Sequence, residues 1–332
     1  MEIVEVDPRD DAAFAQWFSV VQAVERLERP QDTNSLLHEQ QRFSLSDKDC
    51  RKHLLVALDG GDTVGAARLE LPQTDNEHLG EILLMVHPDA RRRGNGRALD
   101  DELVRRVRTE GRSTVLTICD EPPGVDLGNR QAGLALGYQH AQTEVRRDID
   151  LPLRPALVAQ LKQTCAPYAA DYDLVTWWDR CPDDLLEDCA ALNQAMSTDV
   201  PKDQMDWREE VWDGARLRRN EEQVAAMDRT YVASGAVHRS TGRMVAFTTM
   251  GVPRSAPERA YQWETLVLRE HRGNRLGMLV KLAALQELAT KMPATQYIST
   301  WNAQENAPMI AVNDALGART IGGIAALQKV LS

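Results

Sequence analysis

The feature of this sequence that most constrains its fold is an internal repeat. Arg91 follows a valine by five residues and opens a short basic stretch, and Arg272 does the same 181 residues later. Gly137 and Gly317, each preceded by leucine, are 180 residues apart, so the register holds over more than 40 residues in each half. The length of 332 residues also exceeds the roughly 100–200 residues of one domain. We therefore predict two copies of one fold in tandem.

The boundary between the two copies is expected near residue 155. Three prolines interrupt a Leu- and Ala-rich stretch within residues 150–170, which is typical of a linker. The predicted domains are residues 1–155 and residues 156–332.

Both halves show the same order of helical and strand patterns, which predicts an α/β fold with a mixed central sheet flanked by helices. The first half is expected to contain a helix over 10–28, strands over 53–58, 64–71 and 81–86, a helix over 96–110, a strand over 113–118, a helix over 128–136 and a strand over 142–150. The second half is expected to contain a strand over 172–178, a helix opened by residues 182–185, a long charged helix over 204–226, strands over 230–237, 243–252 and 260–268, a helix over 275–290, a strand over 296–300, a helix over 304–316 and a strand over 321–330.

Composition points to a globular protein and away from a nucleic-acid partner. Hydrophobic residues make up 43% of the chain and charged residues 27%, which suits a sizeable core. The formal net charge of -11 has the wrong sign for binding phosphates over a broad face, whereas it attracts small cations such as amines.

Five scattered cysteines, without C-x-x-C spacing or a zinc-like histidine pattern, indicate a reducing compartment and no metal site. The first residues lack the basic and apolar regions of a signal peptide, and no apolar run approaches the ~20 residues that span a bilayer. We expect a cytoplasmic protein with no metal, membrane or nucleic-acid partner, as a monomer or a homodimer.

The segment with the clearest chemistry is residues 86–99, where a strand pattern ends, a basic loop with glycines follows and a helix pattern begins. Glycine lets the backbone approach a ligand closely, a helix start presents unpaired N–H groups, and arginines add charge-assisted hydrogen bonds. This combination predicts a pyrophosphate cradle, with a solvated basic helix start as the alternative. Neither a Walker loop nor a G-x-G-x-x-G dinucleotide loop is present.

Arg91-x-x-Gly94-x-Gly96 resembles the Gln/Arg-x-x-Gly-x-Gly/Ala loop with which GNAT acyltransferases bind the pyrophosphate of coenzyme A. In the second half, residues 271–277 resemble the HRG-x-x-LG loop of many actinobacterial GNAT proteins, and residues 301–317 resemble the segment that follows it. The resemblance covers essentially the whole chain. Arg275 departs from the pattern by replacing the middle glycine, where it either crowds the pyrophosphate or adds a bond to it.

This resemblance implies two tandem GNAT domains that use acetyl-coenzyme A or a related acyl-coenzyme A. It implies cofactor contacts from the fourth strand of each half, from both loops and from one asparagine: Leu84, Met85, Val86, Arg91, Arg92, Arg93, Gly94, Asn95, Gly96, Arg97, Leu266, Val267, Leu268, Arg272, Gly273, Asn274, Arg275, Gly277 and Asn306.

The resemblance also implies transfer of the acyl group to a primary amine, with the acyl carbonyl polarised by backbone N–H groups of the fourth strand. A carboxylate on that strand serves as general base, and Glu264 and Glu81 are the candidates, expected on one face of their strands. Many family members have a tyrosine about five residues before the glycine of a Leu-Gly-Phe motif. Here, counting back four residues from Gly137 and Gly317 reaches Gly133 and Asn313, and neither is tyrosine. Asn313 is the candidate for bonding the leaving thiolate. The alternative to these catalytic roles is that Glu264 and Glu81 are surface or strand-edge residues and that Asn313 caps a helix or lies on the surface.

Six acidic residues crowd the start of the predicted 204–226 helix: Asp199, Asp203, Asp206, Glu209, Glu210 and Asp213. With tryptophans nearby they suit a cationic amine of a small molecule or peptide, although a solvated helix face is the alternative. The other functional reading is a coenzyme-A-binding protein in which one or both halves no longer catalyse.

Overall fold

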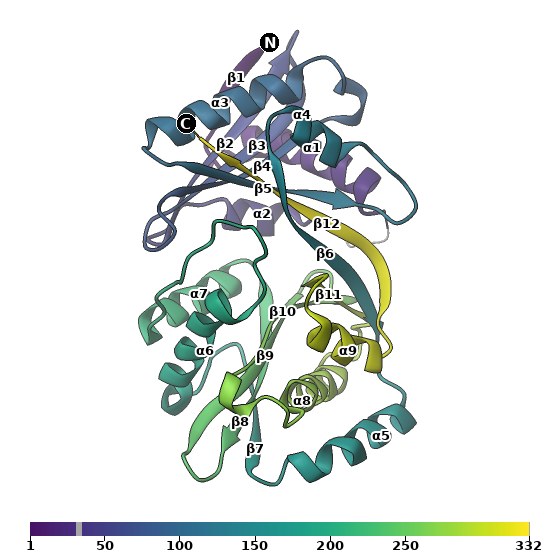
Figure 1. Cartoon of the computed structure of the whole chain (residues 1–332). Helices are drawn as coiled ribbons and strands as arrows, with labels where there is room; N and C mark the ends of the chain where they lie inside the picture. Colours follow the sequence, from purple (N-terminus) through teal and green to yellow (C-terminus); the bar gives the residue numbers. More distant parts are fainter. Residues whose placement is uncertain (31–34, 332) are drawn as a thin grey trace. The chain divides into compact units, whose positions relative to one another are not determined.

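A computed structural model describes residues 1–30 and 35–331. The first half follows the predicted order of elements (Figure 1). It contains β1 (Glu2–Val6), α1 (Asp11–Glu28), α2 (Leu37–Phe43), β2 (Cys50–Asp59), β3 (Asp62–Pro72), β4 (Leu79–Val86), α3 (Asn95–Thr109), β5 (Thr114–Glu121), α4 (Asn129–Ala135) and β6 (Gln139–Asp150).

The second half repeats this order after one additional helix. It contains α5 (Pro155–Cys165), β7 (Tyr172–Trp178), α6 (Leu186–Asp199), α7 (Gly214–Ala226), β8 (Arg229–His238), β9 (Arg243–Pro253), β10 (Arg259–Val267), α8 (Leu276–Lys291), β11 (Tyr297–Ala303), α9 (Ala307–Ala315) and β12 (Arg319–Val330). The mixed α/β fold class and the tandem arrangement are confirmed.

The chain forms two compact units, and neither is one continuous segment. The first unit consists of residues 1–144, 202–208 and 322–332, and the second of residues 145–201 and 209–321. Strand order is β1-β2-β3-β4-β5-β12 in the first unit and β6-β11-β10-β9-β8-β7 in the second. The last strand of the chain thus completes the sheet of the first unit, and the last strand of the first half completes the sheet of the second. The division into domains at residue 155 stays a prediction from the sequence.

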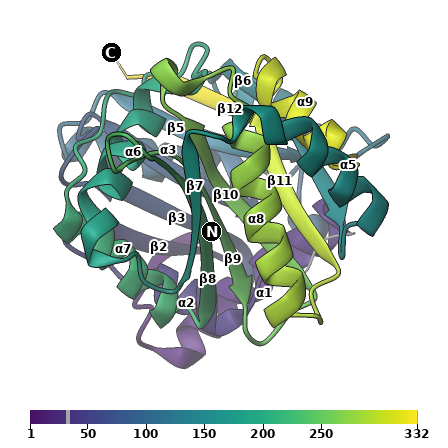
Figure 2. The ribbon, with the colours of Figure 1, turned by 90° about the horizontal axis from the view of Figure 1, so that it is seen from below.

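Each sheet carries helices on both faces, because its strands are apolar on both sides. In the first unit α1 packs against one face through Phe14, Trp17 and Val21, and α3 packs against the other through Leu99 and Leu103. In the second unit α6 and α7 cover one face, while α8 covers the other and lies alongside β10 and β11 (Figure 2). The two ends of α3 and α8 that follow the basic loops are therefore held firmly against their sheets.

Three local predictions need correction or completion. The helix predicted over 204–226 begins only at Gly214, because Asp213 caps it by accepting from the N–H of Arg216 at 2.7 Å, and residues 202–208 form an irregular segment of the first unit. The stretch predicted as a linker contains α5, whose residues pack against the α8 core. β1 and α2 were not predicted, because both are short, with five and seven residues, and α2 is also mostly polar.

No helix among the described residues is long and apolar enough to cross a membrane.

A buried ion pair fixes β6 in the second sheet. Asp148 on β6, which is 1% exposed, accepts two hydrogen bonds of 2.8 Å from Arg259 on β10 and one of 2.7 Å from Ser299 on β11. Breaking such a pair leaves an uncompensated buried cation, which costs about 3–5 kcal/mol.

We expect Asp148→Asn to lower the free energy of unfolding by about 3 kcal/mol or more, for that reason. Asp150→Asn is the matched control on the same strand, because Asp150 is 71% exposed and its ion pair with Arg319 spans 3.5 Å. Urea titrations of both variants measure the effect. Equal midpoints for the two variants would contradict the role given to Asp148.

Candidate functional site

In each unit, two parallel strands pair at one end and separate at the other. β4 and β5 pair over residues 79–82 and 114–117, although both strands continue further. β10 and β11 pair over residues 259–261 and 297–299, although β10 continues to residue 267. Beyond these pairs, the facing backbone groups of the described strands have no strand partner. We call this opening the splay of each unit.

The loop that follows the separated strand has the same backbone conformation in both units. Its second residue lies in the left-handed region, at φ 63° in Arg92 and φ 86° in Gly273. Its fourth residue does the same, at φ 88° in Gly94 and φ 52° in Arg275. A side chain at a left-handed position is strained by about 1–2 kcal/mol. Each loop therefore places glycine at one of the two positions and arginine at the other, so Arg275 keeps the loop shape instead of disrupting it.

The first arginine of each loop braces the loop from inside. Arg91 donates from Nε to the last carbonyl of β4 at 3.3 Å and from its terminal nitrogen to Glu28 on α1 at 2.7 Å. Arg272 makes the same two bonds, to the last carbonyl of β10 at 3.1 Å and to Asp199 on α6 at 2.9 Å. Both guanidinium groups are thus engaged within the protein, and they hold the loop at the end of its strand.

Two asparagines complete the bracing. Asn95 is buried and donates from Nδ2 to the carbonyl of Ala90 at 3.0 Å. Asn274 donates to the carbonyl of His271 at 3.1 Å and to the hydroxyl of Tyr172 at 3.2 Å. These predicted binding residues contribute to the shape of the loops, and their carboxamides face the protein.

The outer surface of the first loop is open and positively charged. Arg92, Arg93, Gly94 and Arg97 are exposed, and a Cβ added at Gly94 would meet no atom within 4 Å. The first N–H that bonds back into α3 is that of Ala98, to the carbonyl of Gly94 at 3.1 Å, so the preceding amides remain available. In the second loop a Cβ at Gly273 also meets open space. There the Arg275 guanidinium lies over the Tyr168 ring at 5.0 Å, which leaves backbone N–H groups as the main donors.

The predicted strand contacts can be made by backbone only, because the side chains enter the core. Leu84, Val86, Val267 and Leu268 pack with the cores under α3 and α8, and Met85 and Leu266 pack on the opposite faces. The two inner glycines lie close to the strand ends, since a Cβ at Gly96 would be 3.5 Å from Val86 and one at Gly277 would be 3.8 Å from Val267. Asn306 caps α9 by accepting from the N–H of Met309 at 3.3 Å.

A β-bulge in β10 positions Glu264. The pairing of β10 with β9 shifts between Gln262 and Thr265. As a result, Trp263 and Glu264 of β10 both lie opposite Thr249 of β9. Gln262 holds the distorted backbone by donating from Nε2 to Thr248 Oγ1 at 2.8 Å and to the carbonyl of Thr249 at 2.6 Å. Glu264 thus lies on the part of β10 that no longer pairs with β11.

The environment of Glu264 disfavours its ionised form. Its N–H donates to Thr249 Oγ1 at 3.1 Å, and the same hydroxyl donates to its carboxylate. Burial raises the pKa of Glu264, the Thr249 bond opposes that rise, and the nearby Glu210 carboxylate adds to it. A carboxylate with a raised pKa is a better proton acceptor near neutral pH.

The first unit lacks this arrangement. β3 and β4 pair without a shift, and the pair that corresponds in position to Thr249 and Glu264 is Arg68 opposite Leu83. Glu81 lies earlier on β4, opposite Glu70, within the section that still pairs with β5. The two glutamates proposed from the sequence therefore occupy different parts of their strands, and only Glu264 lies in a splay.

Asn313, the other predicted catalytic residue, is enclosed within the second unit. Its side chain is 0% exposed, and its Oδ1 accepts from Lys281 Nζ at 2.8 Å. Its Nδ2 donates to Asn302 Oδ1 at 2.6 Å. Both polar ends of Asn313 are thus engaged within the protein, and its catalytic role stays a prediction. Lys281 and Asn302 were not identified from the sequence, because a lysine within an apolar helix pattern gives no sign of burial.

The six acidic residues near α7 do not form one rim. Asp199 pairs with Arg269 and Arg272, Asp206 is bound within the first unit to Thr114, Asp213 caps α7, and Glu209 accepts from Gln194. Glu210 is the member that influences Glu264, and it accepts from Trp212 Nε1 at 2.7 Å.

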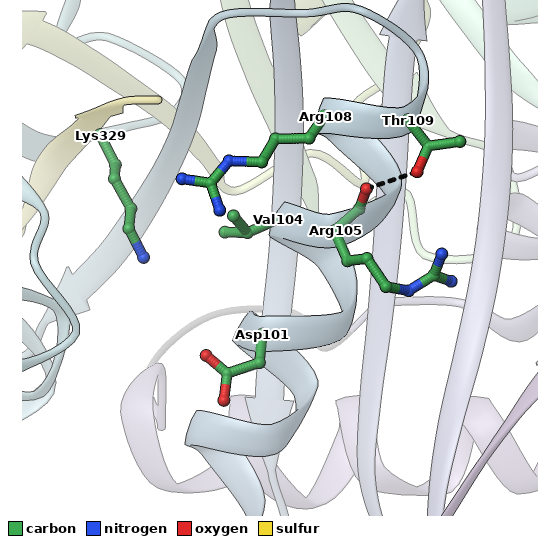
Figure 3. Close-up of a pocket in the computed structure, with 6 residues that line it drawn as sticks. All are labelled: Asp101, Val104, Arg105, Arg108, Thr109 and Lys329. Carbon is green, nitrogen blue, oxygen red and sulfur yellow. Dashed lines mark hydrogen bonds between the residues drawn. The ribbon is translucent and has the colours of Figure 1, made fainter. Parts of the chain in front are cut away.

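A cavity of about 550 Å³ lies elsewhere, along the C-terminal half of α3. Figure 3 shows side chains of α3 facing Lys329 of β12 across it. Its position, away from the loop at the start of α3, separates it from the splay. Within residues 1–30 and 35–331 no group of three or more His, Cys, Asp or Glu side chains could hold a metal ion.

Comparison with known proteins agrees with this geometry. Residues 15–130 match the Acetyltransferase (GNAT) family model. A solved tandem GNAT protein from the clavulanic acid biosynthesis pathway, studied without AcCoA, is 27% identical over 99% of this chain and 98% of that chain, with a TM-score of 0.80. A GCN5-related N-acetyltransferase from Sphaerobacter thermophilus shares the fold, at 13% identity over 99% of this chain and 95% of that chain, with a TM-score of 0.62. No curated protein matches the chain.

A parallel strand pair that opens beside a glycine- and arginine-containing helix start, present twice, defines an N-acetyltransferase with a repeated domain. Residues 15–130 match the GNAT acetyltransferase family, and the chain as a whole is similar to a solved tandem GNAT protein. Proteins of this family use acetyl-coenzyme A and act on amine acceptors.

The residues at both loops fit the pyrophosphate of that cofactor. Each loop presents outward amides at a helix start, beside an open position that an added Cβ would occupy without contact. The first loop adds three exposed arginines, whereas the second depends mainly on its backbone.

The raised pKa of Glu264 makes a prediction about stability. The protonated carboxyl is favoured in the folded protein, so its stabilising contribution is complete below the ordinary pKa of about 4.3 and is lost as the pH rises through the raised value. Glu264→Gln removes this dependence. The free energy of unfolding of the variant, relative to wild type, should therefore increase from about pH 4 to about pH 7. Urea titrations across this range test it, and a difference that does not change with pH contradicts it.

Proposed function

We propose that the second unit transfers an acetyl group from acetyl-coenzyme A to a primary amine, with Glu264 as general base. The observation that supports this proposal is the carboxylate of Glu264, held by the β10 bulge and by Thr249 on the part of β10 that has separated from β11. The catalytic assignment to Glu264 was made from the sequence, and the bulge provides a physical reason for it.

The chain's own groups divide the work between three places. The amides of the second loop and of the start of α8 bind the pyrophosphate. The unpaired backbone edge of β10 orients and polarises the acyl carbonyl, where preorganised N–H groups stabilise developing negative charge. Bound acetyl-coenzyme A supplies the acyl thioester. Glu264 accepts the proton of the amine, directly or through water, so that the nitrogen lone pair becomes available.

The first unit binds coenzyme A without catalysis in this proposal. Arg68, which is paired with Glu70, stands opposite Leu83 where the second unit has Thr249 and Glu264. A guanidinium in this place, already paired with Glu70, cannot accept the proton of an amine. The end of α1 also pairs with the separated part of β5, through Arg29 and Asp120 at 3.2 Å.

The acceptor proposed for the second unit is a cationic amine of a small molecule or a peptide. Glu210 and Glu264 are coupled electrostatically, and Trp263 lies beside Tyr231 at 5.9 Å between ring centroids. Carboxylates beside aromatic rings favour ammonium groups, and proton transfer to Glu264 then generates the neutral amine. A cytoplasmic location, and a monomeric or homodimeric state, stay predictions from the sequence.

Gly94→Glu is expected to weaken coenzyme A binding at the first loop by at least tenfold. The new carboxylate would face the phosphates and would strain a left-handed position at φ 88°. Gly94→Asn is the control, because asparagine tolerates this conformation and adds no charge. Calorimetry with coenzyme A measures affinity and stoichiometry. If both remain at wild-type values in Gly94→Glu, the first unit does not hold the cofactor.

Glu264→Gln is expected to lower turnover by about 10²–10³-fold, since it removes the proton acceptor. Glu81→Gln is the matched substitution in the first unit and should change turnover by less than about threefold. Thiol release from acetyl-coenzyme A, measured with a panel of primary amines, tests the pair. A larger loss in Glu81→Gln would make the first unit the working one.

A further inference from the structure

The second unit contains a polar chain of three side chains that the proposed mechanism leaves unused. Lys281 on α8, Asn313 on α9 and Asn302 on β11 are joined by hydrogen bonds of 2.8 Å and 2.6 Å. Lys281 is 1% exposed and Asn313 0% exposed, whereas Asn302 is half-buried. The chain therefore runs from the interior to an accessible end.

A lysine without a carboxylate partner is an unusual group to bury at this depth. Burial is the one cause that lowers the pKa of Lys281, to about 7, and its ammonium has a single acceptor among the described residues. An apolar side chain would fill the same place without this desolvation penalty. The lysine thus calls for an explanation beyond packing.

Lys281 determines the direction of every bond in the chain. An ammonium can only donate, so Asn313 must present its Oδ1 to it. Asn313 then presents its Nδ2 to Asn302, which must accept with Oδ1. The Nδ2 of Asn302 is therefore the outward end, and it has no acceptor among the described residues. While Lys281 is protonated, the donor at the buried end thus produces a donor at the accessible end; above its pKa of about 7 the neutral amine can also accept and no longer imposes this direction.

This outward donor borders the splay. β11 pairs with β10 only as far as Ser299, and Asn302 lies three residues further along the separated section. Lys281 lies one turn along α8 from Gly277, which faces the end of β10 at Val267. The three side chains thus connect the helix that follows the second loop with the opposite wall of the splay.

We propose that Asn302, oriented by Lys281 through Asn313, donates a hydrogen bond from Nδ2 to the leaving thiolate of coenzyme A. This inference rests on the proposed function of the second unit. As the amine nitrogen forms its bond to the acyl carbon, the carbon–sulfur bond breaks and its electron pair stays on sulfur. Glu264 has by then taken one proton from the ammonium, the second N–H proton leaves to water as the amide forms, and Asn302 stabilises the sulfur anion until water returns a proton to it.

The proposal explains how the second unit acts without the tyrosine that many family members have at position 313. An amide donor cannot transfer a full proton, but a donor polarised by an ammonium through two amides is stronger than an isolated one. Asn302 is the catalytic residue in this scheme, and Lys281 and Asn313 are positioning residues.

The test compares wild type with Asn302→Leu, Asn302→Asp and Lys281→Met, using coenzyme A and desulfo-coenzyme A as probes. The thiol pKa of bound coenzyme A is followed by the ultraviolet absorbance of the thiolate, and both affinities are measured by calorimetry. Any contribution of the first unit is common to all these proteins. Asp100→Asn is the control, because Asp100 is a charge buried to 1% at the corresponding place on α3, where it bonds to Tyr138 and Lys329.

We expect wild type to lower the thiol pKa and to prefer coenzyme A over the desulfo analogue. Both Asn302 variants should reduce this preference by about 10- to 100-fold, the range for a charge-assisted hydrogen bond. Lys281→Met should reduce it about 3- to 10-fold, because Asn313 is then released from its fixed orientation. Turnover should fall through kcat with little change in KM, and Asp100→Asn should leave the thiol pKa unchanged.

Three outcomes overturn the proposal, and the first also overturns the function on which it rests. If wild type does not bind coenzyme A, the proposed function fails. If wild type binds it and the Asn302 variants keep the same thiol pKa, only the present inference fails. Equal losses of affinity for both probes would show that Asn302 contacts another part of the cofactor. If Lys281→Met does not fold, the two Asn302 variants, whose substitution is at the accessible end, still test the proposal.

Discussion

Two parallel strands that separate halfway leave backbone groups unpaired inside a sheet, and the rest of each unit is arranged around that opening. A buried backbone group without a partner costs about 1–3 kcal/mol, so a splay persists only where other groups or a ligand satisfy it. The loop arginines Arg91 and Arg272 take the last carbonyl of the separated strand, and helices α3 and α8 begin beside it. The opening, the loop and the helix start thus form one structure, which explains why they occur together in both units.

The two units keep the same backbone while their side chains have diverged. Both loops use left-handed backbone at the same two positions, yet the glycine has exchanged places with arginine between them. The strand beside the splay is bulged in the second unit, with Glu264, and regular in the first, with Leu83. Main-chain hydrogen bonds and packing preserve the fold, whereas a catalytic carboxylate also requires the bulge and its hydroxyl partners. The fold therefore occurs in both units, although the bulge and the carboxylate proposed as general base belong to the second unit.

Buried charge distinguishes the interiors of the two units. At one position of α3 and α8 the first unit has Asp100, paired with Lys329, and the second has Lys281, bound to an amide. In the first unit Lys329 neutralises the charge of Asp100 locally, and a structural role is enough to explain this pair. The second leaves a cation whose direction of hydrogen bonding is transmitted through Asn313 to the edge of the splay, and a polar chain with one defined direction can serve chemistry.

The sequence by itself determined the repeat, the order of elements and the basic loops, and it offered Glu264 and Glu81 as candidate bases, because each of these depends on local pattern or on spacing along the chain. It overextended the helix that begins at Gly214, and it did not reveal α5 within the proline-containing stretch. Only the tertiary structure decided which strand completes each sheet, where β10 bulges, and that Lys281 and Asn313 meet Asn302. These features arise from contacts between residues far apart in the chain. Local periodicity records which face of an element is apolar, but it carries no information about the partner that the face will meet.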